Sequence, residues 1–318
     1  MVRGLALCGI LSANIVAITG IQVWGTAGAD PGLVGHLYET LVHQRFFPVF
    51  SFLFGLSAVL FLGAARGGME PPRTVLLARF GFLLPFGLAH QVLQPGEVLV
   101  SYAVIGIVFG LPASFLPRRA VLAGGTAATL ASLLIAEGGV TLIPGLFLLG
   151  MAAGAYDVPG LIARRSGRIA AAFYPTALLA AGLNVWQVTM GAAAFDSPLP
   201  AAAGAVTGAA YAIGLLMLLR RERLHAALSF VLQPLGRLAL TNYITATPLV
   251  IAADHLLDLG GHPRVAAVVG TALAILALQV LFSRAWLRHH RYGPLEWAWR
   301  CLTWWRLVPN RPRPAAER

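Results

Sequence analysis

A histidine and a glutamate on either side of a short turn are the residues best suited to proton transfer. His90 is followed by Gln-Val-Leu-Gln, by the turn-forming pair Pro95-Gly96 and then by Glu97, which opens the next apolar run. A histidine oriented by a nearby carboxylate is a common general base. The spacing predicts a catalytic pair, although Glu97 also suits the first turn of a helix, where the helix dipole favours a negative charge.

His43 is the second candidate for a catalytic base. It lies in residues 22–44, which also contain Asp30 and Glu39, and Arg45 follows it at the start of an aromatic-rich run. The long side chain of an arginine at a helix end commonly extends to the membrane interface. Arg45 therefore has two interpretations, as such an interfacial residue or as the anchor for an anionic part of a substrate.

Three polar residues lie inside long apolar runs, where burying them costs free energy. Asn14 lies near the middle of the first run, and Asn242 and Tyr243 lie near the start of a later run that also contains three threonines. Hydrogen bonds between helices explain such residues as well as contact with a substrate does. We expect these three side chains to line an interior cavity.

A metal site is not predicted. Asp254 and Asp258 share one face of a helix, and His255 and His262 are close in sequence, but a Gly-Gly pair interrupts the helix before His262. The chain also contains no phosphate-binding glycine loop, no Gly-x-Ser-x-Gly elbow and no zinc-ligand spacing.

All of these side chains belong to a chain that is too apolar for a soluble domain. Hydrophobic residues make up 58% of it and charged residues 11%, and the mean hydropathy is +0.76. Soluble domains carry about 25% charged residues. Runs of about 20 apolar residues cross a bilayer as helices, because only a helix satisfies its own backbone there. The sequence predicts an all-α, polytopic integral membrane helical bundle, with residues 1–318 forming a single transmembrane domain.

About ten transmembrane helices are predicted. Three residues separate the fifth from the sixth, so these two form either a hairpin or a re-entrant pair. The expected spans are Gly4–Ile21, Phe46–Ala65, Val75–Leu93, Val98–Leu116, Ala120–Ala136, Val140–Tyr156, Ile169–Met190, Leu199–Leu219, Leu238–Leu257 and Val265–Phe282.

The distribution of arginine along the chain predicts how the protein is oriented in the membrane. The chain contains no lysine, and ten spans place 21 arginines on one side of the membrane and only Arg45 and Arg264 on the other. Because basic residues accumulate on the cytoplasmic side, both termini are predicted to be cytoplasmic. The net charge of +11 then reflects this bias and attraction to anionic lipid headgroups. Membrane lipids are the expected partners, and nucleic-acid binding is not predicted.

The C-terminal segment, residues 284–318, is rich in tryptophan and arginine. We expect it to form a cytoplasmic helix in the headgroup region and to end in a disordered tail from Pro309. Within it, an ion pair with an arginine is the simplest role for Glu296. Cys8 and Cys301 lie in the first span and in this tail, so no disulfide is expected.

Four segments together resemble the YeiB-like family of bacterial inner-membrane proteins, whose C-terminal half is a domain of unknown function (DUF418). They occur in the family's order along nearly the whole chain. The matching strings are Arg3-Gly4-Leu5-Ala6 with Gly9-Ile10-Leu11 and Asn14; Arg45-Phe46-Phe47-Pro48 with Phe50-Ser51-Phe52-Leu53-Phe54-Gly55; His90 with Gly96-Glu97-Val98-Leu99 and Tyr102-Ala103; and Gly236-Arg237-Leu238-Ala239-Leu240-Thr241-Asn242-Tyr243 with Gly293-Pro294-Leu295-Glu296-Trp297.

This family is remotely similar to transmembrane acyltransferases such as heparan-α-glucosaminide N-acetyltransferase and bacterial sugar O-acyltransferases. Those enzymes pass an acyl group from cytoplasmic acyl-CoA to an acceptor across the membrane, with a histidine as the proposed catalytic residue. Their first span carries an arginine followed eleven residues later by a polar residue, and here that pair is Arg3 and Asn14. The resemblance implies a substrate-binding role for both residues.

The chain departs from these families at two positions. The acidic residue that usually lies three positions before the arginine would precede Met1, so we expect an in-frame extension upstream that encodes it. Sugar acyltransferases often have histidine where this chain has Asn14. The catalytic histidine must then be His90 or His43.

The sequence thus predicts an acyltransferase-like protein of the inner membrane. Acyl-CoA, the donor, binds at the arginine-rich cytoplasmic face and reaches the cavity lined by the three intramembrane polar residues. His90, oriented by Glu97, deprotonates an acceptor hydroxyl or amine, and Arg45 holds an anionic part of the acceptor. The alternative is a transporter or flippase of a small molecule or lipid-linked metabolite, in which the same polar helices form a translocation path. A non-catalytic membrane scaffold is a third interpretation.

Overall fold

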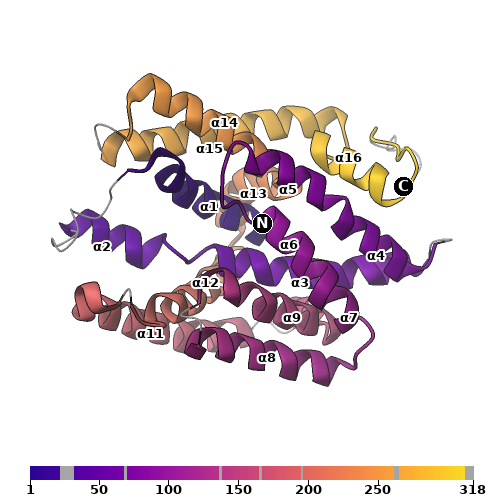
Figure 1. Ribbon diagram of the computed structural model, residues 1–318, viewed down its shortest axis with the longest axis horizontal. Helices are drawn as coiled ribbons and strands as arrows, with labels where there is room; N and C mark the ends of the chain where they lie inside the picture. The colour runs from indigo at the N-terminus through magenta and orange to yellow at the C-terminus, as the bar shows by residue number, and fades with distance from the viewer. Residues whose placement is uncertain are drawn as a thin grey trace.

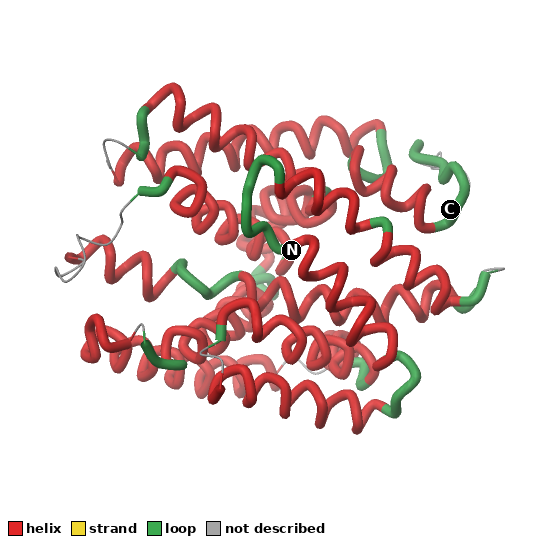
Figure 2. The backbone as a smooth tube through the Cα atoms, in the orientation of Figure 1, coloured by secondary structure: helices red, strands yellow, loops and turns green. Residues whose placement is uncertain are grey.

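The computed structural model describes residues 1–21, 32–67, 70–135, 138–164, 167–194, 196–260 and 265–311. Every regular element in these ranges is a helix, and Figure 2 shows the helices joined by short loops. The predicted all-α class is therefore confirmed. Several positions used in the sequence analysis lie outside the described ranges, namely Asp30, Gly261, His262, Arg264 and residues 312–318.

Figure 1 labels the α-helices in chain order; a π-helix (η1) and two 3₁₀ helices (η2 and η3) lie between them. The elements are α1 (Val2–Thr19), α2 (Gly32–Leu41), α3 (Phe47–Ala65), α4 (Pro72–Gly81), α5 (Leu83–Gln91), α6 (Leu99–Ile105), η1 (Gly106–Gly110), α7 (Leu111–Ala113), α8 (Arg118–Ile135), η2 (Gly139–Thr141), α9 (Leu142–Ala155), α10 (Val158–Arg164), α11 (Gly167–Met190), η3 (Gly191–Ala194), α12 (Leu199–Leu218), α13 (Glu222–Arg237), α14 (Ala239–Leu257), α15 (Val265–His289) and α16 (Pro294–Thr303).

Five of the described helices are long and apolar enough to cross a bilayer: α1, α3, α11, α12 and α15. There is a sixth span if η2 and α9 are counted together with α10 as one helix that is bent by 56°. The chain is thus built as a multi-pass membrane protein. Helices α8 and α14 have membrane length, 18 and 19 residues, but are more polar. The total of ten spans stays a prediction.

Two of the expected spans are broken helices. The segment Val75–Leu93 divides into α4 and α5 at Phe82, and Val98–Leu116 becomes α6, η1 and α7. Pro85 and Pro112 have no amide hydrogen to donate to the carbonyl groups four residues before them, and their rings crowd those carbonyls. The helix therefore breaks or widens in the turn before each proline.

Helix α3 lies in the middle of the bundle, with α14, α15 and α16 on one side and α8, α9 and α11 on the other (Figure 1). Its contact with α9 depends on glycine. A Cβ atom on Gly55 would collide with the carbonyl oxygen of Phe147, and one on Gly150 would collide with that of Phe52. Small residues allow membrane helices to approach this closely, so these two glycines fix the pairing of α3 with α9.

The last helix, α16, packs against α4 and α14 instead of lying apart from the bundle. Trp299 is buried, and its indole Nε1 donates a hydrogen bond of 2.8 Å to the carbonyl oxygen of Arg79 in α4. The first six residues of the expected interfacial segment belong to α15. The C-terminal helix thus contributes a wall to the interior of the protein.

Candidate functional site

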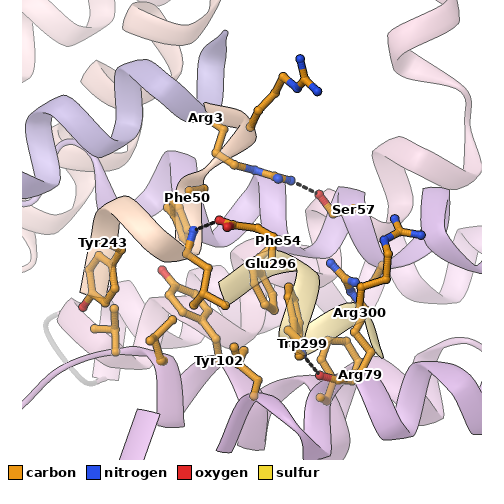
Figure 3. A pocket seen from close by; sticks show the side chains of 18 of the residues that line it. Arg3, Phe50, Phe54, Ser57, Arg79, Tyr102, Tyr243, Glu296, Trp299 and Arg300 are labelled. Carbon is orange, nitrogen blue, oxygen red and sulfur yellow. Dashed lines mark hydrogen bonds between the residues drawn. The ribbon is translucent and has the colours of Figure 1, made fainter. Parts of the chain in front are cut away.

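A cavity of about 200 Å³ lies between α1, α3, α4, α6, α14 and α16. Its walls are mainly aromatic and aliphatic, but four arginines also line it. Figure 3 shows Arg79 and Arg300 on the side of the cavity opposite to Tyr243. The lining residues with polar or aromatic side chains are Arg3, Phe50, Phe54, Ser57, Arg79, Phe80, Tyr102, Arg237, Tyr243, Tyr292, Glu296, Trp299 and Arg300.

Aromatic rings and one hydroxyl hold these arginines in place. The guanidinium carbon of Arg79 lies 3.8 Å from the centre of the Trp299 ring, and that of Arg300 lies 4.5 Å from the centre of the Tyr292 ring. Arg3 donates a hydrogen bond of 2.6 Å to the hydroxyl of Ser57 (Figure 3). Stacking uses the flat faces of a guanidinium group, and its N–H donors lie on the edges. The edges of Arg79 and Arg300 are therefore suited to an anion.

Glu296 is the one carboxylate among the described residues that line this cavity, and it is already engaged with the start of α14. It accepts hydrogen bonds of 2.6 Å and 3.1 Å from the amides of Leu240 and Thr241, and one of 2.6 Å from the Thr241 hydroxyl. Glu296 therefore caps α14 from another helix, satisfying amides that have no partner within α14. One carboxylate against four arginines leaves the cavity with a net positive charge.

His90 and Glu97 meet as predicted from their positions around the turn. The imidazole Nδ1 lies 3.5 Å from a Glu97 carboxylate oxygen, and Nε2 lies 2.8 Å from the Thr247 hydroxyl. Glu97 also accepts hydrogen bonds from the amides of Leu99 and Val100, of 2.6 Å and 3.0 Å. Both sequence interpretations of Glu97 are therefore compatible with the geometry: it caps α6 and lies beside the histidine.

Tyr243 separates His90 from the cavity. The rings of the two residues meet edge to face, with their centroids 5.1 Å apart, and Tyr243 lines the cavity whereas His90 is only 1% exposed. The Asn14 side chain lies close to the Tyr243 hydroxyl. Contrary to expectation, Asn14 is not among the residues that line the cavity, and the buried pair lies one aromatic ring away from it.

Asn242 lies outside the cavity, contrary to expectation. Its amide nitrogen donates to the Ser283 hydroxyl at 3.1 Å, and its backbone carbonyl accepts from Gln279 at 2.7 Å. Both partners belong to α15. Because neighbouring residues of a helix point in different directions, Tyr243 faces the cavity while Asn242 ties α14 to α15.

Arg45 also lies away from the cavity, and no part of it is exposed. It donates five hydrogen bonds of 2.7–3.3 Å. Burial lowers the pKa of Arg45 to about 10, and the nearby Glu39 carboxylate opposes that shift. The acceptors are the backbone oxygens of Thr40, His43 and Pro200 and the side-chain oxygens of Asn184 and Gln187.

This geometry gives Arg45 a structural role, because a guanidinium group has five N–H donors. His43 pairs with Glu39 at 2.8 Å in the segment that precedes Arg45. The sequence left Arg45 as an interfacial residue or as the anchor for an anion, and in this structure its N–H groups are engaged by oxygens of the protein.

Arg79, Arg237 and Arg300 were missed by sequence reasoning, as were Tyr102 and Ser57. Arginines beyond the ends of apolar runs are explained by membrane orientation, and that explanation hid their position in the cavity wall. The sequence did contain a signal for these residues, because an arginine is directly next to an aromatic residue in Arg79-Phe80 and in Trp299-Arg300.

Comparison with known proteins identifies the family. The "Uncharacterized 39.9 kDa protein in amylase 3'region" of Bacillus acidopullulyticus is 32% identical over 326 residues, which cover 96% of this chain and 93% of that protein. A family model described as "Protein of unknown function (DUF418)" matches residues 159–306. The chain belongs to the DUF418 family. The predicted YeiB-like membership is thereby confirmed.

Two further relatives match shorter stretches of this DUF418 protein. "Uncharacterized protein YeiB" of Escherichia coli (strain K12) is 38% identical over 68 residues, 21% of this chain and 18% of YeiB. "Uncharacterized protein YxaH" of Bacillus subtilis (strain 168) is 35% identical over 82 residues, 24% of this chain and 20% of YxaH. No solved structure matches the chain.

The residues matched by the DUF418 model supply only part of the cavity. They include Arg237, Tyr243, Glu296 and Arg300, whereas Arg3, Arg79 and the His90–Glu97 pair precede them. The N-terminal half is therefore needed to complete the site.

Proposed function

We propose that this DUF418 protein is a membrane acyltransferase that moves an acyl group from cytoplasmic acyl-CoA to an acceptor at or across the bacterial inner membrane. The observation that carries the proposal is the cavity itself. Its arginines suit an anionic donor, its aromatic walls suit an apolar group, and Tyr243 lies between it and the buried His90 and Glu97. The remote resemblance to transmembrane acyltransferases, given in the sequence analysis for Arg3 and Asn14, implies the same activity.

The arginines bind the phosphate groups of the donor. Charge-assisted hydrogen bonds from arginine to phosphate are short, strong and often bidentate. Pockets that hold a whole drug-sized ligand have volumes of about 300–1,000 Å³, and this cavity has about 200 Å³. We therefore place only the thioester end of acyl-CoA inside, between Phe50, Phe54 and Tyr102, with the nucleotide part at the arginine-rich mouth.

Transfer requires an acceptor hydroxyl or amine to attack the thioester carbonyl carbon. His90 accepts the proton of that group, a bond forms between the acceptor and the acyl carbon, and the carbon–sulfur bond breaks. The proton then passes from His90 to the departing CoA thiolate. Glu97 stabilises the imidazolium that forms between these steps. Tyr243 covers His90, and the Thr247 hydroxyl holds Nε2 while Nδ1 faces Glu97. The reaction therefore needs both Tyr243 and Thr247 to move so that Nε2 can reach the acceptor, a kind of gating step common in enzymes.

The proposal is tested with the purified protein in detergent. Binding of acetyl-CoA and palmitoyl-CoA is measured by equilibrium dialysis, and release of free thiol is measured after adding a bacterial membrane extract as the source of acceptor. Binding of either thioester with acceptor-dependent thiol release supports the enzyme. Absence of binding to both thioesters contradicts it.

Transport is the second candidate function, and the broken helices favour it. Helices α4 and α6, which line the cavity, are interrupted near Pro85 and by the η1 π-helix, and discontinuous helices form the substrate sites of many transporters. A transporter or flippase would move its substrate across proteoliposomes without releasing any CoA thiol. The same thiol assay therefore separates the two functions.

A further inference from the structure

A second, larger cavity of about 700 Å³ lies between α3, α9, α10, α11 and α12. Its walls are apolar with one exception, the charged residue Arg168 at the start of α11. Pockets of about 300–1,000 Å³ hold whole organic ligands. The remaining lining residues are Val2, Pro48, Val49, Phe52, Leu53, Leu56, Leu146, Ala153, Val158, Pro159, Leu161, Ile162, Ile169, Ala172, Ala205, Ala209, Ala212, Ile213 and Leu216.

Helix α3 separates this cavity from the arginine-lined one. Phe50 and Phe54 line the first cavity, whereas Leu53 and Leu56 line the second. At the N-terminus of α1, Val2 lines the second cavity and Arg3 the first. The apolar cavity is therefore a distinct space, and its contents need not enter the first one.

The depth of the apolar cavity matches one leaflet of a bilayer. Along α12 its wall extends from Ala205 to Leu216, which at 1.5 Å per residue is about 16 Å. The hydrocarbon core of a bilayer is about 30 Å thick, so each leaflet contributes about half of that. A space of this depth fits one acyl chain that enters from the arginine-rich side.

Two basic residues lie at one end of the cavity. Arg168 is exposed there, and Arg220 donates a hydrogen bond of 3.0 Å to the backbone oxygen of Ile162, another lining residue. Ile162 belongs to α10, which turns away from α9 by 56° and so lies across this end of the cavity. Basic residues at this level attract anionic lipid headgroups.

We infer that the cavity binds one acyl chain of an anionic phospholipid, whose phosphate is held by Arg168. An apolar cavity stays free of water and takes up apolar ligands instead. In a bilayer the abundant apolar groups are lipid chains, and the charge at the mouth selects an anionic headgroup. The inference does not depend on the proposed acyl transfer, because the two cavities lie on opposite sides of α3.

The test uses the full-length protein in detergent, with dipalmitoyl-phosphatidylglycerol as the probe and native mass spectrometry as the measurement. Wild type is expected to retain one lipid molecule at activation energies that strip the others. Ala209→Trp fills the cavity and should abolish that retained molecule. Ala181→Trp is the matched control, because Ala181 is exposed on α11 and does not line the cavity.

The headgroup is tested separately. Arg168→Gln should lower the affinity for phosphatidylglycerol about fivefold, the effect of one basic residue near an anionic headgroup. Arg223→Gln, an exposed arginine outside the cavity, should leave the affinity within about twofold.

A second measurement needs no variant. Phosphatidylglycerol with a photoreactive group on its acyl chain should crosslink to the cavity-facing parts of α3 and α12. Even labelling of all lipid-facing helices, or equal lipid retention by wild type and Ala209→Trp, would show only general contact with bilayer lipid and overturn the inference.

Discussion

The imidazole Nδ1 of His90 lies 3.5 Å from a carboxylate oxygen of Glu97, and both side chains are buried. The turn between α5 and α6 brings them together, and the amides of α6 hold the carboxylate in place. Thr247 occupies the other ring nitrogen at 2.8 Å. The imidazole is thus held in a fixed orientation, and the Tyr243 ring beside it separates it from the cavity.

The first prediction concerns the arginines of the cavity. Arg79→Gln and Arg300→Gln should each lower the affinity for palmitoyl-CoA about tenfold, because a hydrogen bond to a charged group contributes about 1.5–3 kcal/mol. Equilibrium dialysis measures the change. Arg118→Gln, an exposed arginine outside the cavity, should have little effect. Equal losses in all three variants would mean that the donor binds by general charge attraction, and not in this cavity.

Arg45→Lys should destabilise the protein without weakening donor binding. Lysine offers three donors to the five oxygens that Arg45 contacts, and unpaired buried acceptors make the loss roughly 2–4 kcal/mol. Thermal unfolding in detergent measures it, with exposed Arg66→Lys as control. Normal stability with lost palmitoyl-CoA binding would instead return Arg45 to the substrate site.

Removal of the cap on α14 should also destabilise the protein. Glu296→Ala leaves the amides of Leu240 and Thr241 without their acceptor, and loss of a helix cap typically costs about 0.5–2 kcal/mol. Glu222→Ala, an exposed residue in the first turn of α13, should change stability by less than about 0.5 kcal/mol. Identical melting curves for the two variants would remove this role of Glu296.

The orientation in the membrane is tested with reporter fusions. Fusions after Arg118, Arg220 and Arg306 should report the cytoplasm, and fusions after Ser197 and Gly260 the opposite side, because arginine-rich loops stay inside. A signal from outside the cytoplasm at Arg220 would contradict the predicted placement of both termini.

The sequence predicted the helical class and the His90–Glu97 pair because both depend on local information. Apolar runs form helices in a membrane wherever they occur, and a short turn brings its two ends together. The breaks in α4–α5 and α6–α7 each precede a proline, but Pro175, Pro234 and Pro248 lie inside continuous helices, so proline alone does not locate a break. Contacts between residues that are a few positions apart can therefore be predicted from the sequence.

The cavity could not be read in this way because it depends on contacts between distant helices. Asn242 forms a hydrogen bond with Ser283, which is 41 residues away in the sequence. Arg45 forms one with Gln187, which is 142 residues away. The close approach at Gly55 and Gly150 decides which faces of α3 and α9 are in contact. The pattern of hydrophobic residues along the sequence does not specify those faces. In the sequence, the arginines of the cavity look like any arginine on the predicted cytoplasmic side, so only the packing of α1, α4, α13 and α16 reveals them.

The most direct test of the account is the transfer of a labelled acyl group from acyl-CoA by wild type and by His90→Ala. Wild type should transfer label to a membrane acceptor and release an equal amount of CoA thiol. His90→Ala should bind acyl-CoA normally, stay folded at the assay temperature and transfer about 10²–10⁴-fold more slowly, the usual contribution of a general base. Equal rates in the two proteins, or no transfer by wild type in the presence of bound acyl-CoA, would contradict the account.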